Sequence, residues 1–211
     1  WLGRQGFSAP KIYNADAENG FLLIEDLGDG LFGKLMVETP EATMNLYVAA
    51  TDVLIQLHKI APLKLAVCDT DWLVDASQLV FDWYASDDSA SATFNTLFRP
   101  LAQRLDDVPR VVILRDYHAE NLLWLPDRDG IAQVGLLDFQ DALLGHPAYD
   151  LVSILQDARR DVTPDIQTAM IARYIDKSGT NAEDFNSAFA LLGVQRNLRI
   201  LGIFARLCLR D

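Results

Sequence analysis

Short stretches of alternating apolar and polar residues stand near the start of the chain. The segments Lys11–Asp16 and Phe21–Glu25 are typical of strands, and Asn19-Gly20 between them strongly favours a tight turn. The pattern therefore predicts a β-hairpin. Because a two-stranded hairpin is only marginally stable alone, we expect the chain to begin inside a fold whose earlier strands precede Trp1.

The apolar spacing becomes helical further along. Thr39 is the predicted N-cap of a helix and Pro40 its first residue. Two more helices are predicted at Asp71–Tyr84 and Thr93–Leu105, and Pro100 is expected to kink the second because proline has no amide donor. The apolar stripe of the first helix consists of Leu46, Ala50, Val53, Leu54 and Leu57.

The middle of the chain returns to strand patterns. A turn at Pro126–Gly130 separates the second and third of three short strands. Helices resume at Ala148, with start signals at Thr163-Pro164 and Asn181 and a stop signal at Gly179. The fold class that this order predicts is α+β. The three strands are Val111–Leu114, Leu122–Leu125 and Val134–Leu137.

Composition narrows the class of protein. The 211 residues are 50% hydrophobic, and 18 Lys and Arg against 30 Asp and Glu give a net charge of −12. This is typical of a folded protein and disfavours nucleic acid as a partner. Charges interrupt every long apolar run, which predicts no membrane partner and, without a signal-peptide pattern, a cytoplasmic location. Cys68 and Cys208 share no metal-type spacing with histidine and are predicted to be buried free thiols.

Candidate chemistry stands at the ends of the central strands. Asn121 follows Asp116 by five positions, and Asp138 follows the third strand. This order is typical of Mg²⁺-dependent phosphoryl transfer from ATP. Asp116 would orient and deprotonate the substrate hydroxyl, and Asn121 and Asp138 would hold Mg²⁺ through oxygen atoms. The alternative, turn-capping side chains, explains each residue singly but not their joint spacing.

The same residues carry a family resemblance. Leu114–Asn121 resembles the His-Gly-Asp-x-His-x-x-Asn catalytic loop of the aminoglycoside phosphotransferase and choline kinase group, which has a protein-kinase-like fold. The resemblance implies a remnant of the N-terminal lobe with the hinge at 1–28, and a mostly helical C-terminal lobe with a small central β-hairpin region at 29–211. It also implies that His118 organises the catalytic loop and that Asp150 braces it. The residues whose backbone would bind ATP are Ile24, Glu25, Asp26 and Leu27.

A longer stretch resembles one subgroup more closely. The run at 136–162 is similar to bacterial kinases that phosphorylate the anomeric hydroxyl of N-acetylmuramate and N-acetylglucosamine. Asp141 and Arg159 are candidate substrate residues, since an arginine would suit the carboxylate of N-acetylmuramate. Two alternatives stay open: a choline or aminoglycoside kinase of the same fold, and a non-catalytic pseudokinase that only binds.

Two departures from the family pattern matter. Leu114 stands where the family has its first catalytic-loop histidine. No glycine-rich phosphate loop or strand lysine is found, and Lys11 lies too close to the hinge to replace that lysine. The chain is therefore predicted to be a hinge plus C-terminal lobe that is inactive alone.

Other conspicuous residues have plainer interpretations. The aromatic residues Trp72, Trp83 and Tyr84 have helical spacing and are predicted to be core residues rather than a sugar-stacking surface. His58 is predicted to be a core or helix-end histidine. The charged run at 157–161 is typical of a solvated helix face.

Overall fold

The structure is a computed structural model that describes residues 1–210, and helices make up most of it. Three 3₁₀ turns accompany them at η1 (Leu2–Gln5), η2 (Pro40–Ala42) and η3 (Gly130–Gln133). The α-helices are α1 (Phe32–Glu38), α2 (Thr43–Leu57), α3 (Thr70–Trp83), α4 (Asp88–Asp106), α5 (Ala148–Leu155), α6 (Pro164–Ser178) and α7 (Ala182–Arg210).

The strands form three separate antiparallel pairs. Strand β1 pairs with β2, β3 with β6, and β4 with β5. The strands are β1 (Ile12–Asp16), β2 (Phe21–Ile24), β3 (Val111–Ile113), β4 (Leu122–Trp124), β5 (Val134–Leu136) and β6 (Leu143–Gly145). The α+β class and the three central strands predicted from the sequence are confirmed. Strand β6 was not predicted.

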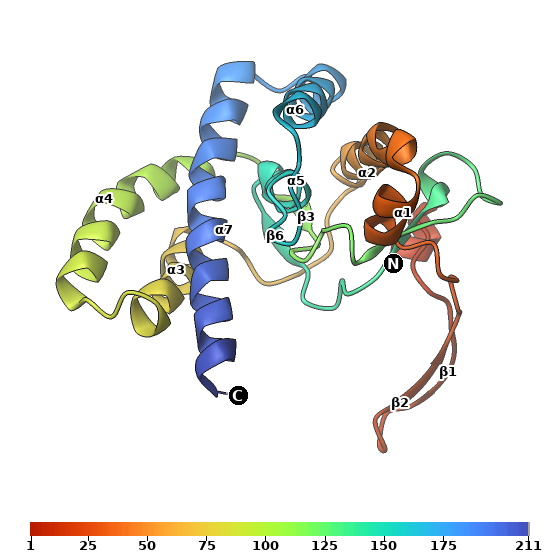
Figure 1. Ribbon diagram of the computed structural model, residues 1–211, viewed down its shortest axis with the longest axis horizontal. Coiled ribbons are helices and arrows are strands. Elements are labelled where there is room, and N and C mark those ends of the chain that lie inside the picture. Colours follow the sequence, from red (N-terminus) through yellow and green to blue (C-terminus); the bar gives the residue numbers. More distant parts are fainter. Residues whose placement is uncertain (211) are drawn as a thin grey trace.

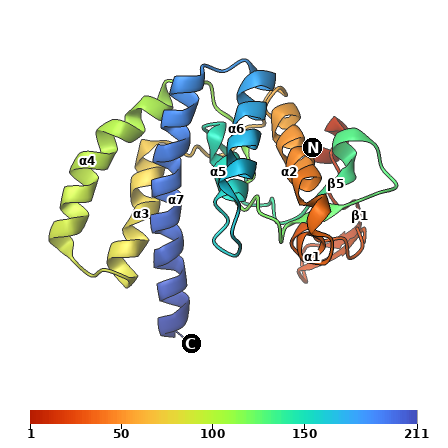
Figure 2. The ribbon, with the colours of Figure 1, turned by 45° about the horizontal axis from the view of Figure 1, so that its top comes forward.

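The helices surround the central strands in two groups. Helices α3, α4 and α7 lie together on one side, with α7 running along α3 and also touching α5 (Figures 1 and 2). Helix α2 packs on α6 on the other side, next to α1. One continuous apolar cluster connects both groups through α5 and the strands. This cluster holds the ends of β3, β4 and β5 in fixed relative positions.

The predicted hairpin is present and projects from the body (Figure 1). Every residue of β1 and β2 is exposed. Some residues before the hairpin are buried instead. Leu2 and Phe7 belong to the main apolar cluster, and Ser8 forms a β-bridge with Gly135 of β5. A lobe boundary at residue 28 stays a prediction.

The beginning of α2 corrects one prediction. Thr39 makes no side-chain capping bond, Pro40 begins the 3₁₀ turn η2, and the α-helix starts only at Thr43. The helix itself is confirmed, and all five residues of its predicted stripe are buried. Helix α1, directly before it, was not predicted because Leu31 at its N-cap supplies no capping side chain.

Side-chain caps begin three of the later helices. The caps of α6 and α7 were predicted, whereas the cap of α4 makes that helix longer than predicted. The carboxylate of Asp87 accepts hydrogen bonds from two amides, and α4 starts at Asp88, five residues before the predicted Thr93. Thr163 caps α6, Gly179 ends it in the left-handed region at φ 70°, and Asn181 accepts amide hydrogen bonds at the start of α7.

Helix α7 is long and apolar enough to cross a membrane by composition alone, with a mean hydropathy of 1.3 over its best window. Its residues Phe185, Leu192 and Gln195 are buried against the other helices. A helix that covers the core of a globular domain passes the same test, so the feature is weak evidence for a membrane.

Burial corrects two further predictions. Cys68 is buried, but Cys208 is exposed near the end of α7. Tyr84 is 66% exposed, whereas Trp72 and Trp83 are half-buried, and of the three only Trp72 packs against the main apolar cluster. His58 is a helix-end residue as predicted, with Nδ1 2.6 Å from the Tyr174 hydroxyl.

His146 makes the stability of the fold depend on pH. Its Nδ1 accepts the Ala148 amide at 3.1 Å, and burial lowers the pKa of the imidazole to about 4. The folded state therefore keeps it neutral, whereas the unfolded chain binds a proton below about pH 6.5. Its contribution is fully present above that pH and is lost as the pH falls towards 4.

We expect His146→Asn to reduce this acid sensitivity. Between about pH 7 and about pH 5 the free energy of unfolding should fall by about 2 kcal/mol less in the variant than in the wild type. Urea denaturation at both pH values measures the difference, and other titrating groups cancel because both proteins contain them. An equal fall in both proteins would contradict the assignment.

Candidate active site

Strand pairing brings together the two loops that carry the predicted residues Asp116, Asn121 and Asp138. The loop at 114–121 connects β3 to β4, and the loop at 137–142 connects β5 to β6. Because β3 pairs with β6 and β4 with β5, the two loops must lie side by side. A backbone hydrogen bond of 3.0 Å from the Leu137 amide to the Asn121 carbonyl joins them.

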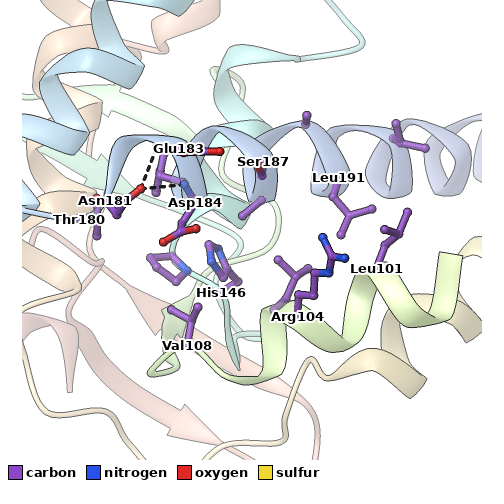
Figure 3. Close-up of a pocket in the computed structure, with 16 residues that line it drawn as sticks. Leu101, Arg104, Val108, His146, Thr180, Asn181, Glu183, Asp184, Ser187 and Leu191 are labelled. Carbon is purple, nitrogen blue, oxygen red and sulfur yellow. Dashed lines mark hydrogen bonds between the residues drawn. The ribbon is translucent and has the colours of Figure 1, made fainter.

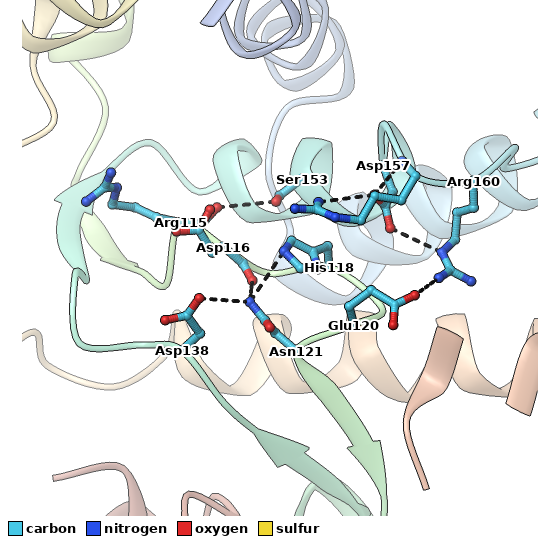
Figure 4. A network of polar contacts seen from close by, with 10 residues as sticks. Arg115, Asp116, His118, Glu120, Asn121, Asp138, Ser153, Asp157 and Arg160 are labelled. Atoms are coloured by element: carbon cyan, nitrogen blue, oxygen red, sulfur yellow. Dashed lines mark hydrogen bonds and ion pairs between the residues drawn. The ribbon is translucent and has the colours of Figure 1, made fainter. Parts of the chain in front are cut away.

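The side chains of Asp116, Asn121 and Asp138 converge between these loops (Figure 4). Asn121 Nδ2 donates to the Asp116 carbonyl at 2.9 Å and lies 3.4 Å from Asp138 Oδ2. The Asp116 carboxylate accepts no hydrogen bond from the part of the chain that the structure describes. It is half-buried and available to an external donor.

The backbone before Asp116 is held in an unusual conformation. Arg115 has φ 70°, in the left-handed region that non-glycine residues rarely adopt. The buried Asp150 carboxylate of α5 accepts the Leu114 and Arg115 amides at 2.6 and 2.9 Å. Ser153 Oγ donates to the Arg115 carbonyl at 3.3 Å. Helix α5 therefore fixes the loop, which is the bracing contact that was expected of Asp150.

Two opposing influences act on Asp150. Burial raises the pKa of its carboxyl to about 7, while the two amide donors act to lower that pKa. Hydrogen bonds from the same two amides replace those that the ionised carboxylate loses to water when it is buried. Asp150 is completely buried, so it supports the loop without access to a substrate.

His118 and Tyr117 attach the loop to its surroundings. His118 Nε2 lies 3.4 Å from Asn121 Nδ2, and burial lowers the pKa of the imidazole. The Tyr117 hydroxyl donates to the Ala50 carbonyl of α2 at 2.8 Å. Both contacts are consistent with the predicted organising role of this segment.

The donor set suits a small, hard cation. Asn121 uses its Nδ2 for the Asp116 carbonyl, which leaves its amide oxygen free to face a ligand, and Asp138 adds a carboxylate. Gln140 Nε2 donates to the other Asp138 oxygen, and Asp138 itself has φ 54°. Mg²⁺ needs few protein oxygens when phosphates and water complete its shell. Within residues 1–210 no group of three or more His, Cys, Asp or Glu forms a metal site.

The predicted nucleotide segment borders a cavity of about 470 Å³. Asp26 and Leu27 line it, together with residues around Trp124 at the end of β4. Ile24 and Glu25 do not line it, and Glu25 instead pairs with Arg128 at 2.8 Å. The structure thus divides the four predicted ATP-binding residues into two that reach the cavity and two that do not.

The two candidate substrate residues, Asp141 and Arg159, make separate ion pairs. The Asp141 side chain is 64% exposed, with Oδ2 3.5 Å from Arg115 Nη1. Arg159 is half-exposed, 3.7 Å from the Asp157 carboxylate. Asp141 also does not cap a turn at Leu143-Leu144, the alternative considered for it, because those residues belong to β6.

Comparison with known proteins decides the family. The phosphotransferase enzyme family matches residues 1–185, which include both loops of the site. The chain belongs to this phosphotransferase family.

Two relatives of this phosphotransferase-family chain, from different bacteria, share one kinase name. The chain is 40% identical to an N-acetylmuramate/N-acetylglucosamine kinase of Caulobacter vibrioides over its whole length, and 34% identical to one of Pseudomonas aeruginosa. It spans 62% and 64% of the lengths of these two relatives.

Solved structures show the same fold at low sequence identity. A choline/ethanolamine kinase family protein of Mesorhizobium loti superposes with a TM-score of 0.72 over all of the chain and 68% of that protein, at 12% identity. A choline kinase of Streptococcus pneumoniae gives 0.69 at 16% identity, covering 97% of the chain and 68% of that protein. The predicted protein-kinase-like fold is confirmed.

One polar network of this phosphotransferase-family chain was missed by the sequence analysis. The Asp157 side chain is only 1% exposed and lies 3.2 Å from Arg160 Nε. Arg160 also pairs with Glu120 of the catalytic loop and lies 3.4 Å from the Gly33 carbonyl of α1 (Figure 4). The charged run at 157–161 is therefore not simply a solvated face. The spacing of three between Asp157 and Arg160 was the available signal.

A second cavity, larger than the one beside Asp26 and Leu27, lies away from this site. It measures about 810 Å³ between α4 and α7, and His146 is one of the residues that line it (Figure 3). Its lining is mostly apolar, and none of Asp116, Asn121 and Asp138 contributes to it.

Proposed function

We propose that the protein transfers the γ-phosphoryl group of ATP to a hydroxyl of a sugar, specifically the anomeric hydroxyl of N-acetylmuramate or N-acetylglucosamine. The observation that carries the proposal is the unpaired Asp116 carboxylate, held beside Asn121 and Asp138 on two interlocked loops. The sugar class comes from the relatives at 40% and 34% identity.

Asp116 acts on the substrate in this proposal. Its free carboxylate oxygens accept the hydrogen bond of the sugar hydroxyl, align that oxygen with the γ-phosphorus, and take the proton as the new bond forms. The bond between the γ-phosphorus and the bridging oxygen breaks, and ADP leaves. Asp150 and Ser153 keep the loop in position throughout.

Asn121 and Asp138 would hold the metal through their side-chain oxygens. Mg²⁺ held there would supply positive charge against the negative charge of the phosphates. The hydrogen bond from Asn121 Nδ2 to the Asp116 carbonyl fixes the side chain that presents this oxygen. Asn121 thereby connects the proton acceptor and the metal ligands in one rigid unit.

The segment at 26–27 receives the nucleotide in this proposal. Asp26 and Leu27 border the cavity beside Trp124, and their backbone groups make no hydrogen bond to other backbone groups within residues 1–210. Free amide and carbonyl groups on one edge of a cavity can pair with the edge of adenine.

A substrate panel tests the proposed function. The full-length protein is incubated with ATP, Mg²⁺ and one of N-acetylmuramate, N-acetylglucosamine, choline or an aminoglycoside, and products are followed by ³¹P NMR. We expect a sugar 1-phosphate from the N-acetyl sugars and none without Mg²⁺. Phosphorylation of choline or the aminoglycoside alone would overturn the sugar assignment. Nucleotide binding with no product from any substrate would favour a non-catalytic binding protein.

A further inference from the structure

Helix α7 carries a buried arginine, Arg196, and two nitrogen atoms of its guanidinium have no hydrogen-bond partner among the described residues. Arg196 is 4% exposed, and its Nε and Nη1 atoms make no hydrogen bond to any residue at 1–210. A buried charge without partners is strongly destabilising in a folded protein. Buried polar groups of native proteins are normally satisfied, so such a group indicates a ligand that completes its bonding.

Two further buried donors without a partner belong to other elements. The Tyr149 hydroxyl of α5 and Arg115 Nε of the catalytic loop are also buried without a partner. The guanidinium groups of Arg115 and Arg199 lie over the Trp72 ring, 5.4 and 5.9 Å from its centre. Trp72 in turn contacts the Tyr149 ring edge-on at 6.2 Å. Two arginines and a tyrosine therefore contact one aromatic ring, and Arg196 lies one helical turn before Arg199 on α7.

The cluster lies within electrostatic reach of the catalytic loop. Burial lowers the pKa of Arg196, and the nearby Tyr149 and the carboxylates of Asp116 and Asp157 act in the opposite direction. Asp157 already pairs with Arg160 at 3.2 Å, and Asp150 accepts two backbone amides. These two carboxylates are thus committed to other partners. The free donors of the cluster are suited to oxygen atoms of an anion.

The two sugars of the proposed function differ in one anionic group. N-acetylmuramate carries a lactyl ether with a carboxylate, and N-acetylglucosamine has a free hydroxyl at that position. A guanidinium matches a carboxylate through two parallel hydrogen bonds.

We infer that Arg196, together with Arg199 and Tyr149, binds the carboxylate of N-acetylmuramate and so determines how well the enzyme uses that sugar relative to N-acetylglucosamine. The inference rests on the proposed function. It differs from the sequence-based expectation that Arg159 meets this carboxylate, because Arg159 is half-exposed and paired with Asp157.

The test compares both sugars in the same variants of the full-length protein. In Arg196→Met we expect kcat/KM for N-acetylmuramate to fall about 10- to 100-fold and that for N-acetylglucosamine by no more than about threefold. Arg196→Lys should lose less, because it keeps the charge without the two-pronged geometry. Arg206→Met, further along the same helix, is the matched control and should leave both values as in the wild type.

Thermal unfolding without substrate separates this role from a structural one. If Arg196 is an unpaired ligand-binding group, Arg196→Met should unfold at the same or a higher temperature, because methionine removes a buried charge and keeps most of the volume. A lower unfolding temperature with equal losses for both sugars would overturn the inference in favour of a structural role.

Two other outcomes are also decisive. Equal losses for both sugars at unchanged stability would overturn the inference, because Arg196 would then act on Asp116 or on the phosphates. Turnover of neither sugar by the wild type would overturn the proposed function and this inference together.

Discussion

Under the proposed function, Asp116→Asn is expected to slow sugar phosphorylation about 10²- to 10⁴-fold while leaving the fold unchanged. Asparagine has the same shape as aspartate but cannot take the proton of the attacking hydroxyl. The wild-type carboxylate accepts no hydrogen bond from residues 1–210, so the substitution breaks no bond within that region. Rates of ADP formation with each N-acetyl sugar measure the effect.

A surface variant and a stability measurement serve as controls for this result. Asp75→Asn changes an exposed aspartate on α3 and should retain full activity. The unfolding temperature of Asp116→Asn should match that of the wild type. If the variant kept more than about a tenth of the wild-type rate, Asp116 would not be the general base.

The largest effect on stability is expected from Gly202→Ala, where α7 crosses α3. A Cβ atom at this position would lie 2.2 Å from the Leu79 carbonyl carbon and 2.5 Å from the Val80 amide nitrogen. Both are backbone atoms of α3, so the helices would have to separate. We expect the free energy of unfolding to fall by about 3 kcal/mol, although alanine favours helix by about 1 kcal/mol over glycine. Urea denaturation followed by circular dichroism measures it.

Gly193 of the same helix offers a matched control. A Cβ atom there would meet Oε1 of Gln156 at 2.8 Å, and this is the end of a flexible side chain that can move. Gly193→Ala should therefore change the stability by less than about 1 kcal/mol. Equal stability of the two variants would show that α7 can shift away from α3 without cost, contrary to the close packing described above.

Local signals in the sequence determined many element boundaries. The Asn19-Gly20 turn, the caps at Thr163 and Asn181, and the stop at Gly179 act through hydrogen bonds and backbone preferences within a few residues. Where these signals were absent or ambiguous, prediction failed. Helix α1 has no capping side chain, and Thr39 was read as a cap although it makes no such bond.

The sequence also determined which residues meet at the centre of the site. Asp116, Asn121 and Asp138 stand directly beside strands, and their order is typical of phosphoryl transfer, so their convergence could be predicted before any pairing was known. The pairing itself required the fold. Strand β6 has only three residues, and its identity depends on β3, which lies 30 positions or more earlier.

Only the tertiary structure decided which polar residues are buried. The sequence presents Asp157 and Arg196 as ordinary charged residues, while packing encloses the first within an ion-pair network and leaves the second without partners. In the same way, Cys208 and Tyr84 are exposed although their apolar neighbours suggested burial. Chain spacing sets the face of a helix on which a side chain lies, but burial depends on what distant segments place against that face.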